Sequence, residues 1–207
     1  MQALGHAKDF LHVLIVQLAT LYRGKEQIPM STRSGEFITL REVMNDVGVD
    51  AARFFFVARK ASSHLDFDIE LAKRQSQENP VYYVQYAHAR ICNIMEFAKS
   101  QAAKKASGGS AAKADLALLK EPQELDLIKT LSQFPDVIIF CAESLEPCGL
   151  VSYLMTLADS FHSFYDKHRV VTDDLALTRS RLVLVDCTRT VIATGLRLLG
   201  VSTPTSM

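Results

Sequence analysis

Hydrophobic and polar positions follow a helical period over most of this 207-residue chain. After about residue 38, apolar side chains recur three and four positions apart, the spacing that gathers them on one face of an α-helix. Besides one longer helix, the pattern predicts shorter helices over 39–47, 50–60, 68–77, 121–133, 136–145, 148–168 and 173–199. The protein is therefore expected to be mainly α-helical.

The longest helix is expected to begin after Asn79, a favourable N-cap residue, with Pro80 at its first position. It should continue to about Lys105, because the small and polar stretch 106–114 has the composition of a mobile loop. Gly200 follows the last helix, where glycine commonly ends a helix. From residue 80 onwards these signals predict an antiparallel bundle of about five helices with the last one in its centre.

The faces of two helices can be placed by angle. Over 148–168, a continuous apolar stripe predicts the core face: Leu150, Leu154, Leu157, Phe161 and Phe164. The last helix is apolar nearly all round, but four polar positions share a narrow arc that should face water: Arg179, Asp186, Thr190 and Arg197.

Residues 12–18 depart from the helical pattern. This short run of β-branched and apolar side chains favours a buried strand. The remaining sequence predicts no partner strands for it. We therefore expect the chain to begin inside a larger domain.

The charge balance excludes one class of function. The 23 Lys and Arg residues equal the 23 Asp and Glu residues, and the pI is about 7.0. Unspecific binding of nucleic acid usually needs a strongly basic surface, so any nucleic-acid partner should meet a local site.

Targeting signals and metal motifs are also missing from the sequence. No apolar stretch reaches the roughly 18 residues of a membrane span, and the N-terminus lacks the profile of a secretory signal. We expect a cytoplasmic protein with reduced cysteines and no membrane partner. The cysteines lack ligand spacing, so no metal site is predicted.

Residues 29–35 form a polar loop, Pro-Met-Ser-Thr-Arg-Ser-Gly, which by composition alone is an ordinary surface loop. Its Met-Ser pair, the basic or hydroxyl residues after it and the following Gly-x-Phe-x-Thr-Leu resemble the KMSKS signature loop of class I aminoacyl-tRNA synthetases. The resemblance implies that three residues act at the phosphates of ATP: Met30, Ser31 and Arg33. Both lysines of the motif are replaced, by Pro29 and Thr32.

The resemblance continues through 50–56, 63–68 and 79–91. The last segment, Asn-Pro-Val-Tyr-Tyr-Val-Gln-Tyr-Ala-His-Ala-Arg-Ile, resembles a specific signature of arginyl-tRNA synthetases. The similarity covers essentially the whole chain and corresponds to the C-terminal portion of that family. Because the HIGH signature of the ATP site would precede residue 1, this chain alone is not expected to activate arginine.

The family resemblance implies a division of the chain. The end of a Rossmann-like catalytic domain with the signature loop is expected over 1–48, a connecting helical segment over 49–78, and the DALR anticodon-binding helical bundle over 79–207. For the full-length enzyme the resemblance implies a monomer that attaches arginine to tRNA-Arg through arginyl-adenylate, with ATP and Mg²⁺.

Aromatic side chains and a guanidinium share one arc of the helix that begins after Asn79: Tyr82, Tyr83, Tyr86 and Arg90. Such a face can stack unpaired bases and bind phosphate. Alternatively, the tyrosines pack under neighbouring helices and Arg90 pairs with an acid. The resemblance favours the first interpretation, because the family binds anticodon bases on this helix.

Three further anticodon contacts are implied by the family: Tyr165, Arg169 and Met207. From the residues alone, Arg169 could instead complement the dipole of the preceding helix, and Met207 could be a frayed end. The histidines lack nucleophiles or carboxylates at a catalytic spacing and are interpreted as structural. Asp66 and Asp68 beside His64 look like part of a metal site, but the family has a linker there.

Two other functions stay open. One is a non-catalytic RNA-binding or helical interaction module that kept the bundle after losing catalysis. The other is the anticodon domain of a related class I or glycyl enzyme, which shares the bundle but lacks the signature of 79–91.

Overall fold

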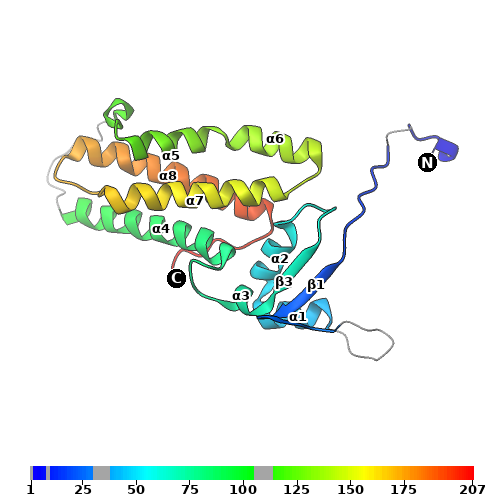
Figure 1. The fold of residues 1–207 in the computed structure, drawn as a ribbon. Helices are drawn as coiled ribbons and strands as arrows, with labels where there is room; N and C mark the ends of the chain where they lie inside the picture. The colour runs from blue at the N-terminus through cyan, green and yellow to red at the C-terminus, as the bar shows by residue number, and fades with distance from the viewer. Residues whose placement is uncertain (1, 8–9, 30–37, 105–113) are drawn as a thin grey trace.

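The computed structural model describes residues 2–7, 10–29, 38–104 and 114–207. A small sheet with short helices lies beside a bundle of longer helices, and residues 10–18 extend away from both (Figure 1). The fold is mainly α-helical, as predicted.

Among the described residues, three strands form the sheet: β1 (Ala19–Arg23), β2 (Glu26–Gln27) and β3 (Leu65–Asp68). The central strand β1 is antiparallel to β2 and parallel to β3. In β3, Leu65 and Phe67 are buried while Asp66 and Asp68 are more exposed, the alternation of a strand with one covered face. Three short helices complete this part of the protein: α1 (Leu40–Val47), α2 (Val49–Val57) and α3 (Ile69–Lys73).

The prediction of a buried strand over 12–18 is wrong. These residues form neither a helix nor a strand, and their apolar side chains are exposed: Val13, Leu14, Ile15, Val16 and Leu18. A strand forms only where its backbone finds a ladder partner, and β3 pairs with the chain from Ala19 onwards. The expectation that the first strand lacks partners is also wrong: β3 lies almost wholly between the helices predicted at 50–60 and 68–77, where no strand is expected from the sequence.

Capping residues set the helix starts that the sequence predicts. Thr39 caps α1, and its hydroxyl accepts a hydrogen bond from the backbone N–H of Glu42 at 3.2 Å. Asn79 Oδ1 accepts from the N–H of Val81 at 3.3 Å, and α4 begins at Pro80. The amide nitrogen of Asn79 also donates to the carbonyls of Ala72 and Arg74, which ties the end of α3 to the start of α4.

In the part of the bundle that the structure describes, there are five α-helices: α4 (Pro80–Lys104), α5 (Pro122–Ser132), α6 (Phe134–Ser144), α7 (Cys148–Lys167) and α8 (Leu175–Leu198). The central helix is α7, which packs against the other four (Figure 1). The prediction that α8 is central is wrong. The helix α8 is less buried than its apolar sequence suggests, because Leu175, Val183 and Leu198 are exposed. The predicted loop at 106–114 lies almost wholly outside the described residues.

The core and the end of the bundle follow the predicted pattern. All five members of the apolar stripe on α7 are buried. At the end of α8, Gly200 has φ +69°, and the N–H groups of Gly200 and Val201 donate to the carbonyls of Arg197 and Leu196. This is a Schellman motif, which requires the left-handed backbone that glycine adopts at little cost. In the described ranges, no helix is both long and apolar enough to cross a membrane.

Gly195 sets the distance between α8 and α7, which leads to a stability prediction. A methyl group at this position would lie 2.7 Å from Cδ2 of Leu154. Gly195→Ala gains about 1 kcal/mol of helix propensity but costs about 1–3 kcal/mol through overpacking, so we expect net destabilisation. In a Leu154→Ala background the clash disappears, and Gly195→Ala should become stabilising. Urea denaturation of the four proteins measures both effects, and the same sign in both backgrounds would contradict this packing.

Candidate nucleic-acid interface

An open groove of about 740 Å³ runs between α4 and the end of α7. We call it the α4–α7 groove. Its lining residues come from α4, from the end of α7 and from the turn that joins α7 to α8: Tyr86, Arg90, Asn93, Ile94, Phe97, Tyr165, Asp166, His168, Arg169, Val170 and Val171. Three of the residues predicted from the family resemblance, Tyr86, Arg90 and Tyr165, therefore lie together, and Arg169 joins them.

Arg90 lies between two aromatic rings. Its Cζ is 4.2 Å from the centroid of the Tyr165 ring and 5.6 Å from that of Tyr86. Cation–π contacts of this kind are worth about 0.5–2 kcal/mol, depending on solvation. Among the described residues, no carboxylate forms a salt bridge with Arg90. The rings therefore orient the guanidinium without neutralising its charge.

The buried side of α4 explains why this face is presented. Val84, Ala87 and Ile91 are buried in the core. At 100° per residue, Tyr86 and Arg90 lie about 135° and about 95° around the helix from the centre of this buried face, which places them on the flank where they meet α7. The rings of Tyr82 and Tyr86 stack nearly parallel, with centroids 6.2 Å apart.

A second hollow of about 390 Å³ adjoins the α4–α7 groove and shares Arg90 and Asp166 with it. Tyr83 lines this hollow, and its hydroxyl donates a hydrogen bond to Asp159 at 3.3 Å. Partial burial raises the pKa of Tyr83, and the charge of Asp159 raises it further. Tyr83 is therefore anchored to α7, and its ring forms a fixed wall beside Arg90.

His162 belongs to this interface, although sequence reasoning treated the histidines as structural. Its ring lies 4.9 Å from that of Tyr83 and 5.9 Å from that of Tyr86, centroid to centroid. Only 9% of the residue is exposed, and Nε2 has no hydrogen-bond partner among the described residues. Its spacing of three residues from both Asp159 and Tyr165 could have indicated a shared face.

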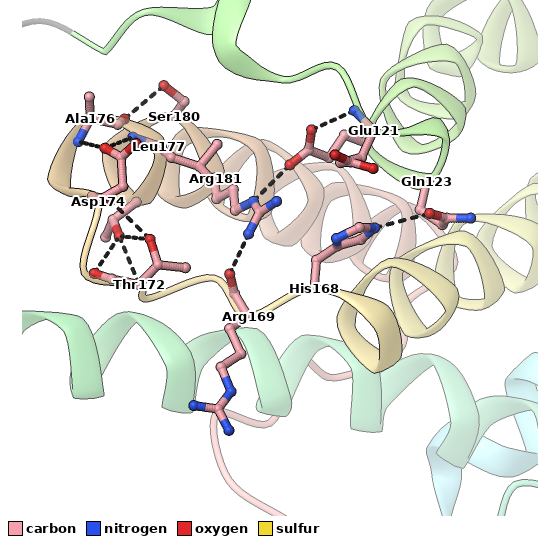
Figure 2. A network of polar contacts seen from close by, with 12 residues as sticks. Glu121, Gln123, His168, Arg169, Thr172, Asp174, Ala176, Leu177, Ser180 and Arg181 are labelled. Atoms are coloured by element: carbon pink, nitrogen blue, oxygen red, sulfur yellow. Dashed lines mark hydrogen bonds and ion pairs between the residues drawn. The ribbon is translucent and has the colours of Figure 1, made fainter.

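Arg169 follows the end of α7 and is held by its backbone. Its carbonyl accepts a hydrogen bond from Arg181 Nη1 at 2.8 Å, while its own guanidinium projects toward α4 (Figure 2). The neighbouring His168 pairs with Gln123 through Nε2 and Oε1 at 3.0 Å. The turn therefore forms a fixed rim of the α4–α7 groove.

Met207 is not among the residues that line either hollow, and it is 49% exposed. The tail that leads to it contacts another side of α4: Gln85 donates to the carbonyl of Ser202 at 3.1 Å, and His88 Nδ1 lies 2.9 Å from the carbonyl of Pro204. At 100° per residue these positions are on roughly the opposite side of the helix from Tyr86 and Arg90. The role of Met207 stays a prediction.

The signature loop cannot be placed, because Met30, Ser31 and Arg33 lie outside the described residues. The side chains of the segment that looks like part of a metal site contact each other or the start of α3. His64 Nε2 lies 3.2 Å from Asp66 Oδ1, and Asp68 caps α3 by accepting from the N–H groups of Glu70 and Leu71. In the described ranges, no group of three or more potential metal ligands gathers.

The charges and rings of the interface suit one kind of ligand. Arg90 and Arg169 supply positive charge, Asp166 opposes them, and Phe97 is exposed at the rim. Aromatic rings stack flat unpaired bases, while guanidinium groups bind phosphate. The local surface can therefore hold single-stranded nucleic acid although the chain has a net charge of zero.

Comparison with known proteins agrees with this geometry. The family described as DALR anticodon binding domain matches residues 84–207. Arginine–tRNA ligases of Syntrophotalea carbinolica and Desulfosudis oleivorans are 52% and 50% identical to this chain over 197 and 207 residues. The matches cover 95% and 99% of this chain but 35% and 37% of those proteins. The chain thus spans about a third of the length of the curated relatives it matches.

The fold is also similar to a solved structure. A protein of Campylobacter jejuni identified as an arginyl-tRNA synthetase matches with a TM-score of 0.83 and 28% identity. The match covers 100% of this chain and 43% of that protein. The likeness therefore includes the small sheet as well as the bundle.

The burial of His162 predicts a pH dependence of stability. Burial lowers the pKa of His162 from 6.5, and the charge of Arg90 lowers it further. The unfolded chain therefore takes up this proton at a higher pH than the folded one, so the free energy of unfolding should fall as the pH drops below about 6.5. His162→Phe keeps an aromatic ring and removes this titration. Urea denaturation at about pH 7.5 and about pH 5.5 should show a smaller loss for the variant. An equal loss in both proteins would contradict a buried, neutral His162.

Proposed function

The chain belongs to the DALR anticodon-binding domain family, and we propose from this that it binds the anticodon loop of tRNA-Arg as the C-terminal part of an arginine–tRNA ligase. The family match over most of the bundle supports an anticodon loop as the ligand. The identity to arginine–tRNA ligases along nearly the whole chain supports the choice of tRNA.

The activity proposed for the whole enzyme is the attachment of arginine to tRNA-Arg in the cytoplasm, with ATP and Mg²⁺, by a monomer that forms arginyl-adenylate. Residues 1–48 would end the catalytic domain, 49–78 would connect it to the bundle, and 79–207 would read the anticodon. Met30, Ser31 and Arg33 would contact the phosphates of ATP. The remaining ATP site would belong to the part of the relatives that this chain does not cover.

One observation carries the proposal: Arg90 is fixed between the rings of Tyr86 and Tyr165 in an open groove. Unpaired bases bind on such aromatic platforms with about 1–3 kcal/mol per base. The platform is already ordered by the packing of α4 against α7, so little side-chain entropy is lost on binding. The anticodon loop supplies the unpaired bases that this surface requires.

The balance of charges at the two hollows suits a nucleic acid that is bound through only a few of its phosphates. Arg90, Arg169 and Lys167 provide the positive charge at the two hollows, and Asp159 and Asp166 limit it. A surface with few cations gives a shallow salt dependence and weak unspecific binding. Selection of one tRNA would then depend on its unpaired bases more than on its charge.

A second candidate is a non-catalytic RNA-binding module. The replacement of both signature lysines, by Pro29 and Thr32, favours it. Both candidates use the same groove, but only the ligase attaches arginine to tRNA-Arg. An aminoacylation assay of the full-length gene product therefore distinguishes them. Charging at any rate above background supports the ligase, and tRNA binding without charging supports the module.

Selective binding is the first expected outcome. The 207-residue chain should bind a tRNA-Arg transcript more tightly than the same transcript with its anticodon bases replaced, because the groove holds the unpaired bases. Fluorescence titration of labelled transcripts at fixed salt measures the two dissociation constants. Equal affinities would contradict an anticodon reader.

Removal of the platform should weaken binding. Tyr86→Ala is expected to cost about 1–3 kcal/mol, or roughly 5- to 150-fold in affinity, because one base loses its stacking surface. Arg90→Ala should also weaken binding, since the guanidinium is lost. The same titration provides the measurement.

Phe140→Ala is the matched control, because this ring is 60% exposed on α6 and lies outside both hollows. It should leave the affinity unchanged. If Tyr86→Ala folds and binds as tightly as Phe140→Ala, then the tyrosine only packs against its neighbours.

A further inference from the structure

A buried ion pair lies behind the turn that joins α7 to α8. Arg181 Nε is 2.7 Å from Glu124 Oε1, and the two side chains are 8% and 0% exposed. Glu124 belongs to the first turn of α5, where its other oxygen accepts from the N–H of Glu121 at 3.0 Å. A buried pair of this kind often contributes little net stability, so its benefit can lie in the geometry that it imposes.

Arg181 has a second partner, and that partner belongs to the proposed interface. Its Nη1 donates to the carbonyl of Arg169 at 2.8 Å. In Figure 2, Arg181 reaches this carbonyl from α8, and the guanidinium of Arg169 projects from the other side of the turn toward α4. One planar group therefore connects the start of α5, the start of α8 and a backbone atom at the rim of the groove.

The turn is also fastened on both sides of this bond. His168 Nε2 lies 3.0 Å from Gln123 Oε1 on α5, and the N–H of Thr172 donates to Thr178 Oγ1 on α8 at 2.9 Å. The hydroxyl of Thr172 donates to the carbonyl of Asp174 at 3.1 Å. Along the chain, the hydrogen bond from Arg181 to the Arg169 carbonyl lies between these two attachments.

We propose that Arg181, oriented by Glu124, is a positioning residue for RNA recognition, because it fixes the backbone of Arg169 so that the Arg169 guanidinium faces the α4–α7 groove. The proposal rests on the proposed function, since it takes RNA as the ligand. A guanidinium can donate to a carboxylate and to a carbonyl in fixed directions from one plane, which an ammonium cannot do. The carboxylate of Glu124 sets the orientation of that plane.

Two double variants separate positioning from stability. Glu124→Gln/Arg181→Met removes both charges together, so that neither is left buried without a partner, and removes the bond to the Arg169 carbonyl. The control is Asp186→Asn/Arg189→Met. It removes a 2.8 Å ion pair on the same helix, but that pair is partly exposed and has no bond to the turn.

The measurement is the affinity of the 207-residue chain for a tRNA-Arg anticodon stem-loop, in each background with and without Arg169→Ala. Thermal melting of each variant reports folding. We expect Arg169→Ala to weaken binding on the order of tenfold in the wild-type and control backgrounds. In Glu124→Gln/Arg181→Met, binding should already be on the order of tenfold weaker, and Arg169→Ala should add almost nothing. This non-additivity is a signature that a purely structural role does not produce.

Additive effects of Arg169→Ala in all backgrounds would overturn the proposal, and so would wild-type affinity of Glu124→Gln/Arg181→Met. If that variant does not fold, Arg181→Lys takes its place. Lysine keeps a positive charge beside Glu124 but cannot donate to both the carboxylate and the Arg169 carbonyl from one plane. The same non-additivity with Arg169→Ala is expected. Failure of the wild-type chain to distinguish anticodons would instead overturn the proposed function, and this inference with it.

Discussion

The packing of α4 against α7 is the contact on which both the fold and the interface depend. Val84, Ala87 and Ile91 enter the core from α4, and the stripe from Leu150 to Phe164 enters it from α7. Because this apolar contact holds the two helices together, the residues on the facing flanks of α4 and α7 stay close to one another. Arg90 consequently meets the ring of Tyr165, and Tyr83 and Tyr86 meet His162. The free energy that stabilises the bundle therefore also orders the interface before any ligand binds.

This arrangement would allow a chain of zero net charge to bind RNA in the way we propose. A cation that lies over aromatic rings is oriented without being neutralised by a carboxylate, so its charge stays available to a ligand. The rings themselves provide stacking surfaces that need no charge. The turn after α7 adds Arg169, whose backbone is tied to a buried ion pair. The proposed affinity would thus come from a few ordered groups instead of a broad basic surface.

Local rules predicted much of the fold. Thr39, Asn79 and Gly200 each determine a helix end through hydrogen bonds that span fewer than six residues, and such signals can be recognised in the sequence. The strand was misplaced because strand formation depends on a distant partner: β1 pairs with residues more than 40 positions later. The last helix was wrongly put in the centre because an apolar sequence does not say which neighbours cover it.

The same distinction applies to the interface. The face of Tyr83, Tyr86 and Arg90 lies on one helix, so helical geometry and the family resemblance were enough to predict it. The Arg181–Glu124 pair joins residues 57 positions apart, and no periodicity connects them. His162 was overlooked because its importance comes from the rings of another helix. Contacts between helices, rather than patterns within them, define the parts of the interface that the sequence did not reveal.

The central claim is that the anticodon loop lies in the groove between α4 and α7. Photocrosslinking tests it most directly, with a photoreactive nucleotide placed either in the anticodon loop or in the acceptor stem of tRNA-Arg, followed by peptide mapping. We expect the anticodon probe to label peptides from 82–97 and 162–171, and the acceptor-stem probe not to label them. Labelling of these peptides by both probes alike, or labelling by the anticodon probe only outside the groove, would contradict it.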